Sequence, residues 1–289
     1  MSVEQVWLNG VLTPASEARV SAFDAGLLHG VGLFETMRAY NGRVFRLDDH
    51  LTRLAASAEA LQIAKSADVE PWRSGVGQVL EANGLTEARV RLLVTPGDVR
   101  GGEPQAGDAG GTVLIAAGPI SPYDDELYTK GMTVLVSGFK QGRYDPTCGH
   151  KTTSYFSRLI ALREAQAHGC GEALWFTTEN LVAEGSISNV FVVTDEVIKT
   201  PPVETPVLPG IARKVVLEIA RGQKLAVQEL PLTIKDLLAA DECFLTNSVM
   251  EVMPVCRVER HAIGQEKPGP ITQRLADGYR ECVKDECGV

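Results

Sequence analysis

Two segments carry side chains of the types that covalent amine chemistry requires. Lys151 stands between Gly149 and the small residues 152–154, after a Gly/Pro-rich stretch and before a strongly helical one. Glu184 begins a Glu-Gly-Ser turn between two apolar strands. Small neighbours leave room for a ligand, and a lysine at the start of a helix is expected to be a good nucleophile because the helix dipole disfavours its protonated form. The plainer alternatives are a surface lysine and an exposed turn glutamate.

Three further segments could bind an anion. The turn at Gly210 leads directly into a predicted helix, whose first unpaired N–H groups belong to Ile211 and Ala212. Ser248 lies at the end of an apolar strand, and Arg53 lies one step from the apolar stripe of another helix. Each also fits an ordinary helix start, strand end or solvated arginine. An amine, an acid and an anion site are what pyridoxal phosphate needs from a protein, since the lysine forms the Schiff base and the acid faces the pyridine nitrogen.

Composition restricts the classes of protein that the chain can belong to. Its 289 residues, 44% hydrophobic and 22% charged, suit an ordinary globular protein of one large or two ordinary domains. The net charge of −9 argues against nucleic acid as a partner, and no apolar run approaches the length of a membrane span. None of the six cysteines forms a CxxC pair, so we expect free thiols and no metal site. Reduced cysteines and the lack of a signal peptide predict a cytoplasmic location.

The elements that must position these residues divide the chain into two parts. We expect a small α/β domain at 1–118, a linker at 119–125 and a larger domain at 126–289. The larger domain is rich in strands, whose sheet is expected to curl into a barrel-like form. The fold class is therefore α+β. Asn-Gly turns predict two hairpins near the N-terminus, and a glycine-rich loop at 97–111 is expected to be either functional or mobile. Predicted helices cover 48–61 (capped by Asp48), 71–83, 154–168, 211–222 and 234–239, and predicted strands include 33–40, 89–95, 112–117, 132–139, 172–177, 181–184, 190–194, 197–200, 242–246 and 251–257.

Taken together, the segments resemble the class IV aminotransferases, the fold-type IV pyridoxal phosphate enzymes. This family includes branched-chain and D-amino acid aminotransferases, (R)-amine transaminases and aminodeoxychorismate lyase. The resemblance runs nearly end to end, and no single marker is specific alone. In chain order the markers are Gly32-Leu33-Phe34-Glu35-Thr36, His50-Leu51-Thr52-Arg53-Leu54, Lys151, Glu184-Gly185-Ser186 with Ser188-Asn189, Leu208-Pro209-Gly210-Ile211, and Glu251-Val252-Met253-Pro254-Val255.

The resemblance implies a cofactor, pyridoxal 5'-phosphate, and a role for each motif. Lys151 would carry the Schiff base and move a proton, and Glu184 would keep the pyridine nitrogen protonated. Arg53, the Gly210–Ala212 turn and Ser248 would hold the phosphate, with Ser188 and Asn189 beside them. Tyr155 is a candidate for the phenolic oxygen of the cofactor, or else an aromatic residue on a helix face. The resemblance also implies a small α/β domain, a larger barrel-like domain, and a homodimer with the active site near its interface.

The choice of substrate is less clearly encoded. We expect a transaminase that moves an amino group from an amino acid or amine to a 2-oxo acid. The alternative is aminodeoxychorismate lyase, which releases pyruvate to give 4-aminobenzoate and uses the same lysine. Arg100 is the candidate anchor for a substrate carboxylate, although a solvated loop arginine fits equally well. Further candidate substrate-binding residues are Phe34, His29, Arg143 and Val249, the last in a segment that looks more like the lyase branch.

Overall fold

The structure, a computed structural model, describes residues 4–64, 68–100 and 111–289. By their contacts these residues form two compact units. The first unit runs to Ser121 and also takes in His150–Ser154 and Val283–Val289, and the second consists of Pro122–Gly149 and Tyr155–Cys282. The division after Ser121 falls inside the linker expected at 119–125. The lysine segment and the C-terminal segment, however, group with the first unit, whereas we expected them in the larger domain.

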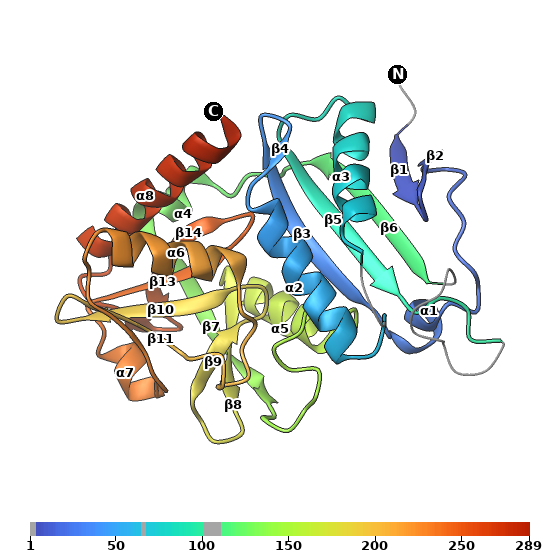
Figure 1. Cartoon of the computed structure of the whole chain (residues 1–289). Helices are drawn as coiled ribbons and strands as arrows, with labels where there is room; N and C mark the ends of the chain where they lie inside the picture. Colours follow the sequence, from blue (N-terminus) through green and yellow to red (C-terminus); the bar gives the residue numbers. More distant parts are fainter. Residues whose placement is uncertain (1–3, 65–67, 101–110) are drawn as a thin grey trace. The chain divides into compact units, whose positions relative to one another are not determined.

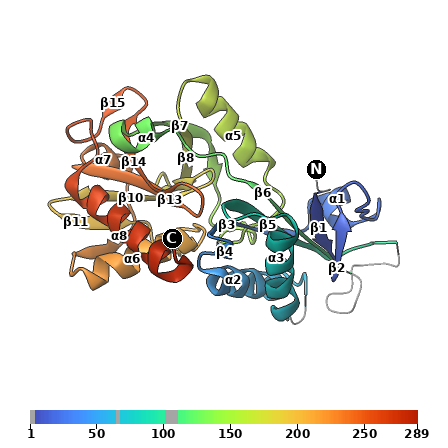
Figure 2. The same cartoon turned by 90° about the horizontal axis from the view of Figure 1, so that it is seen from above.

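The first unit is a six-stranded antiparallel sheet with two helices on one face (Figures 1 and 2). Its strand order is β2-β1-β6-β5-β3-β4. Alternate residues of the central strands, such as Leu33 and Met37 in one and Val90 and Leu92 in the next, are fully buried in one core against those helices. The elements are β1 (Gln5–Leu8), β2 (Val11–Pro14), α1 (Ala25–His29), β3 (Leu33–Tyr40), β4 (Arg43–Val44), α2 (Leu47–Ala60), α3 (Glu70–Ala82), β5 (Ala88–Thr95) and β6 (Thr112–Pro119).

Two details of the first unit differ from the sequence-based prediction. Helix α2 begins after Arg46, whose φ of 56° places it in the left-handed region, so Asp48 lies within the first turn and does not cap the helix. The short helix α1 was not predicted. It is capped by buried Asp24, whose carboxylate also accepts hydrogen bonds from the hydroxyls of Thr95 (2.8 Å) and Thr112 (2.6 Å). Of the loop expected at 97–111, residues 101–110 lie outside the described residues.

The second unit is built on a nine-stranded mixed sheet that curls around its own core. The order is β12-β11-β10-β13-β14-β7-β8-β9, with β15 beside β14. Side chains of β9 at one end, such as Val182, and of β10 near the other end, such as Val190, share one core, and β9 contacts β10. The predicted curled α+β sheet is thus confirmed. The strands are β7 (Met132–Gln141), β8 (Glu172–Thr177), β9 (Val182–Gly185), β10 (Asn189–Thr194), β11 (Val197–Thr200), β12 (Val227–Glu229), β13 (Glu242–Asn247), β14 (Glu251–Val258) and β15 (His261–Ala262).

Helices cover the second sheet at several places. Helix α5 (Phe156–Ala167) lies along β7 and β8, as Figure 2 shows, and α6 (Ile211–Gly222) contacts β13. The others are α4 (Asp125–Lys130), α7 (Ile234–Leu238) and α8 (Pro270–Cys287). The 18-residue helix α8 was missed by the sequence analysis, although it is the longest helix among the described residues. Its residues to Cys282 belong to the second unit and its last turn to the first.

Within residues 4–64, 68–100 and 111–289, no helix is both long enough and apolar enough to cross a membrane. The same residues contain no group of three or more His, Cys, Asp or Glu side chains arranged to hold a metal ion.

Candidate active site

Lys151 is fixed by backbone pairing to the start of β3. The N–H of Phe34 donates to the carbonyl of Lys151 (2.9 Å), and the N–H of Thr153 donates to the carbonyl of Gly32 (2.8 Å). Nζ of Lys151 lies 4.7 Å from the centroid of the Phe34 ring. Helix α5 begins only at Phe156, five residues later, so the predicted reason for an activated lysine is wrong: a dipole effect is confined to the first turn of a helix. What fixes Lys151 is strand-like pairing, which holds its Cα while the side chain lies beside an aromatic ring.

Arg91 is a residue that the sequence analysis missed. Strand β5 pairs with β3 so that Arg91 lies opposite Thr36, and its Nη1 donates to the Thr36 hydroxyl (2.9 Å). Its guanidinium carbon is 3.7 Å from the centroid of the Phe34 ring, the same ring that lies near the Lys151 ammonium. The signal was available in the sequence, since Arg91 occupies an outward position in a strand whose inward residues, such as Val90 and Leu92, are apolar.

Arg53, the predicted phosphate clamp, is held by a buried ion pair. Its Nε and Nη2 donate to the two carboxylate oxygens of Glu35 (2.8 and 2.5 Å), and Nδ1 of His50 lies 2.7 Å from the same carboxylate. Burial by itself would raise the pKa of Glu35, but the positive charge of Arg53 and the hydrogen bonds outweigh it and bring that pKa to about 2. Burial lowers the pKa of His50, so its imidazole is neutral and donates through Nδ1. Glu35 thus fixes one edge of the Arg53 guanidinium.

The remaining predicted residues of the first unit lie elsewhere. Arg100 is 65% exposed and directs its fork at Asp98, with Nη2 2.8 Å from the carboxylate, and it covers the Phe23 ring. His29 is exposed at the end of α1. Among the described contacts, none joins Arg100 or His29 to the group formed by Lys151, Phe34 and Arg91. Their substrate roles therefore stay predictions.

In the second unit, Glu184 is buried at the end of β9 with its carboxylate held from two sides. Oε1 accepts from Nη2 of Arg158 (2.6 Å), and Oε2 accepts from the N–H of Leu208 (2.9 Å) and, more weakly, from the Asn189 amide (3.4 Å). The Glu184 side chain is only 6% exposed. A carboxylate offers about four acceptor positions, so three described donors leave one position on Oε1 for a further donor. This arrangement fits a protonated pyridine nitrogen.

The turn that follows Glu184 is held by its neighbours. The Tyr155 hydroxyl donates to the carbonyl of Ser186 (2.5 Å), and the Trp175 indole donates to the Ser186 hydroxyl (2.9 Å). Ser188 donates to buried Glu172 (2.8 Å), which also accepts three backbone N–H groups. Burial raises the pKa of Glu172, against the opposing effect of these hydrogen bonds. Tyr155 thus donates its hydroxyl proton to the Ser186 carbonyl, and Ser188 donates its own to Glu172. The predicted contact of these two residues with the cofactor stays a prediction.

The predicted anion site lies at the start of α6. Gly210 is the N-cap with no capping side chain, and Ile211 and Ala212 are buried in the first turn, which contains no acidic residue. A side chain at Gly210 would not fit, because an added Cβ would lie 1.9 Å from Oδ1 of Asn189. Asn189 pairs across the sheet with Thr246, whose buried hydroxyl has no hydrogen-bond partner among the described residues. An unpaired hydroxyl near bare N–H groups fits a phosphate.

The other predicted residues of the second unit have separate environments. Asn247 accepts hydrogen bonds from the N–H groups of Val249 and Met250 (both 2.8 Å), which fixes the turn that contains Ser248. The guanidinium of Arg143 stacks on exposed Tyr144, and no described contact joins it to Glu184.

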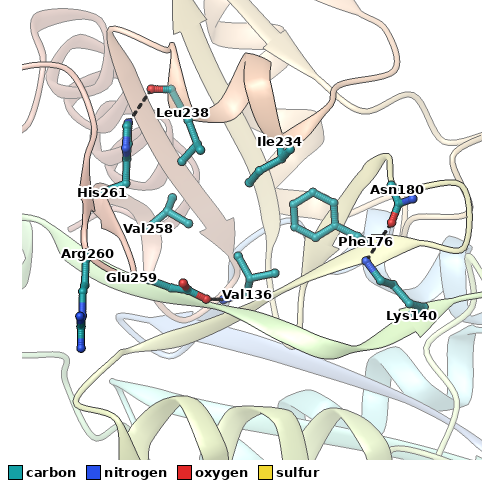
Figure 3. Close-up of a pocket in the computed structure, with 10 residues that line it drawn as sticks. All are labelled: Val136, Lys140, Phe176, Asn180, Ile234, Leu238, Val258, Glu259, Arg260 and His261. Carbon is teal, nitrogen blue, oxygen red and sulfur yellow. Dashed lines mark hydrogen bonds between the residues drawn. The ribbon is translucent and has the colours of Figure 1, made fainter.

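The second unit also contains a cavity of about 590 Å³ (Figure 3). Apolar side chains such as Phe176 and Ile234 form its walls, and Lys140 with Asn180 stands at one end and His261 at the other. None of the predicted site residues lines it.

Comparisons with known proteins identify the family of the chain. The family described as Amino-transferase class IV matches residues 32–258. The branched-chain-amino-acid aminotransferase of Escherichia coli K12 is 31% identical over 96% of this chain and 92% of its own, and the D-alanine aminotransferase of Bacillus licheniformis is 30% identical over 98% of both. A crystal structure of the T.th. branched-chain amino acid aminotransferase with pyridoxamine 5'-phosphate has a TM-score of 0.89, with 31% identity over 96% of this chain and 93% of that one. The chain belongs to the class IV aminotransferases.

Proposed function

We propose that this enzyme is a pyridoxal phosphate-dependent transaminase that moves an amino group between an amino acid or amine and a 2-oxo acid. The observation that carries the proposal is the fixed Lys151, whose carbonyl is bonded to Phe34 and whose Nζ lies beside the Phe34 ring. Buried Glu184, with one acceptor position left, supports it. The names of the aminotransferase relatives favour transamination over the lyase reaction.

Each of these residues has a separate role in the proposed reaction. When bound, pyridoxal phosphate supplies an aldehyde that takes an amine and a ring that withdraws electrons from the bond to be broken. Lys151 would hold the cofactor through Nζ and then move a proton with the same atom. Glu184 would keep a proton at the ring nitrogen. The N–H groups of Ile211 and Ala212 would bind the phosphate.

Three side chains would complete this assignment. The hydroxyl of Ser248 and the guanidinium of Arg53 would bind the phosphate, and Glu35 would keep that guanidinium oriented. For the substrate carboxylate we propose Arg91 beside the earlier candidate Arg100, because Arg91 shares the Phe34 ring with Lys151. A planar fork of donors suits a carboxylate.

We also propose that the enzyme acts as a homodimer, as members of the family typically do. Apolar side chains in and next to α1 support this: Leu27 is 69% exposed, Leu28 48% and Val31 41%. Exposed apolar residues so close together are typical of a surface that another chain covers. Sedimentation at micromolar concentration checks the proposal, and a monomer would contradict it.

The function is tested by following the cofactor in half-reactions. Purified protein with pyridoxal phosphate is reduced by borohydride and digested, and the modified peptide should contain Lys151. Mixing the unreduced protein with L-amino acids, D-amino acids, (R)-amines or aminodeoxychorismate should convert the cofactor with one of the first three. Release of pyruvate and 4-aminobenzoate from aminodeoxychorismate without a 2-oxo acid would instead identify the lyase.

A lysine variant and its control make this test specific. Lys151→Ala should lose the reducible linkage and turnover, since no other amine would replace Nζ. Lys130→Ala removes an exposed lysine that pairs with Glu126 (2.9 Å) and should leave both unchanged. A Lys151→Ala protein that transaminates at the parent rate would refute the lysine assignment.

A further inference from the structure

Arg158 occupies a place in α5 that helix stability does not explain. It is the third residue of that helix, where a cation interacts unfavourably with the positive end of the helix dipole. Its side chain is only 19% exposed, and burial of a charge is costly unless the charge is paired. The partner is the carboxylate of Glu184 at 2.6 Å. The contact between Arg158 and Glu184 therefore compensates for both costs.

The guanidinium of Arg158 also holds the backbone around that carboxylate. Nη1 donates to the carbonyl of Gly185 (2.9 Å), and Nη2 donates to Oε1 of Gln141 (3.2 Å) as well as to Glu184. The guanidinium carbon lies 5.0 Å from the centroid of the Trp175 ring. One planar group thus contacts the acid, the residue after it and Gln141 at the end of β7, which the single point charge of a lysine ammonium could do only in part.

We propose that Arg158 is the positioning residue of Glu184. It holds the Glu184 carboxylate in one orientation, so that the carboxylate can keep a proton at the ring nitrogen of the cofactor. This rests on the proposed function of Glu184. The physical reason is that a buried carboxylate without a positive partner binds a proton itself, and a protonated carboxyl group no longer stabilises a protonated ring.

Among the residues that the structure describes, few other groups near the pair could titrate. The Tyr155 phenol and the Cys148 thiol interact with Arg158, and buried Glu172 holds the next turn. Phenols and thiols ordinarily titrate above pH 8, and burial raises the pKa of Cys148 further. Glu172 is present in every variant proposed below, so a pH effect that appears only on removal of Arg158 belongs to the Arg158–Glu184 pair.

The experiment compares cofactor binding by the full chain and three variants at pH 8 and pH 6. Arg158→Met removes the positive charge. Arg158→Lys keeps a positive charge but lacks the planar guanidinium group. Arg163→Met, an exposed arginine later in the same helix, is the matched control. The dissociation constant of pyridoxal phosphate is measured by titrating the apoprotein, and the thermal midpoint of each apoprotein is recorded.

We expect Arg158→Met to weaken cofactor binding about tenfold at pH 8, similar to the loss of an outer partner at other sites, and further at pH 6. Arg158→Lys should regain most of the affinity and the parent pH dependence, and Arg163→Met should match the parent. The proposal is overturned if Arg158→Met binds like the parent, if its loss is the same at both pH values, or if Arg158→Lys behaves like Arg158→Met. A parent protein that binds no pyridoxal phosphate would instead refute the proposed function, on which the inference rests.

Discussion

The ion pair between Glu35 and Arg53 gives a quantitative prediction. Glu35 is 1% exposed, and its carboxylate is bonded to Arg53 through two nitrogens and to His50 through one. The perturbation is Glu35→Gln, which keeps the shape of the side chain but removes its charge. Arg53 then loses its anionic partner inside the protein. The NH2 group of the new glutamine is itself a donor, so it cannot accept the hydrogen bonds that Arg53 and His50 donate.

The magnitude follows from the pKa of Glu35. That pKa falls from an ordinary value of 4.5 to about 2, and at about 1.4 kcal/mol per pH unit the ionised carboxylate contributes roughly 3 kcal/mol to the free energy of unfolding. Because the folded-state pKa is depressed, this stability is fully present above pH 4.5 and is lost as the pH falls towards 2. The same relation leaves roughly 2 kcal/mol at pH 3.5.

The assay is urea unfolding of the apoprotein, followed by tryptophan fluorescence, at pH 7 and at pH 3.5. Trp7 and Trp72 lie in the core of the first unit and report on it. Glu35→Gln should be roughly 3 kcal/mol less stable than the parent at pH 7, with a smaller gap at pH 3.5. Glu87→Gln, an exposed carboxylate 3.8 Å from Arg38, should cost less than about 1 kcal/mol. Parent-like stability of Glu35→Gln at pH 7, or a gap that widens in acid, would refute the reasoning.

Two predictions concern the substrate and the cofactor. Arg91→Met should raise KM about 10- to 100-fold for amino acids but not for simple amines, because it removes a charged partner of the carboxylate. Arg100→Met should raise KM for amino acids by a smaller factor, because Arg100 already pairs with Asp98. Steady-state kinetics on both substrate classes would contradict this if amines were affected equally. Gly210→Ala should weaken pyridoxal phosphate binding and cost about 1–3 kcal/mol, because its Cβ would meet the Asn189 amide. Gly222→Ala at the other end of the same helix meets nothing within 4 Å and should be neutral or stabilising by up to about 1 kcal/mol, so calorimetry that finds equal losses would disprove the clash.

Much of the secondary structure could be predicted from local sequence. Strand β11 and helix α6 begin and end where we predicted, because β-branched residues mark the strand and a Pro-Gly turn marks the start of the helix. Helix α8 could not be recognised in the same way, since its sequence is strongly polar and its helical state depends on one apolar face packed in place. Helix α1 has only five residues and depends on the cap by buried Asp24.

The sequence by itself predicted the family, which the comparisons confirm, and supplied the residues proposed for the cofactor chemistry, because Lys151, Glu184 and the Gly210 turn lie in short motifs whose order and spacing are characteristic when taken together. The tertiary structure decided which partners each of them has. Arg91 reaches the Phe34 ring through the register of two strands, and Arg158 reaches Glu184 from a separate helix. Such contacts join residues far apart in the chain, and their geometry depends on strand register and helix packing, which local sequence patterns do not specify.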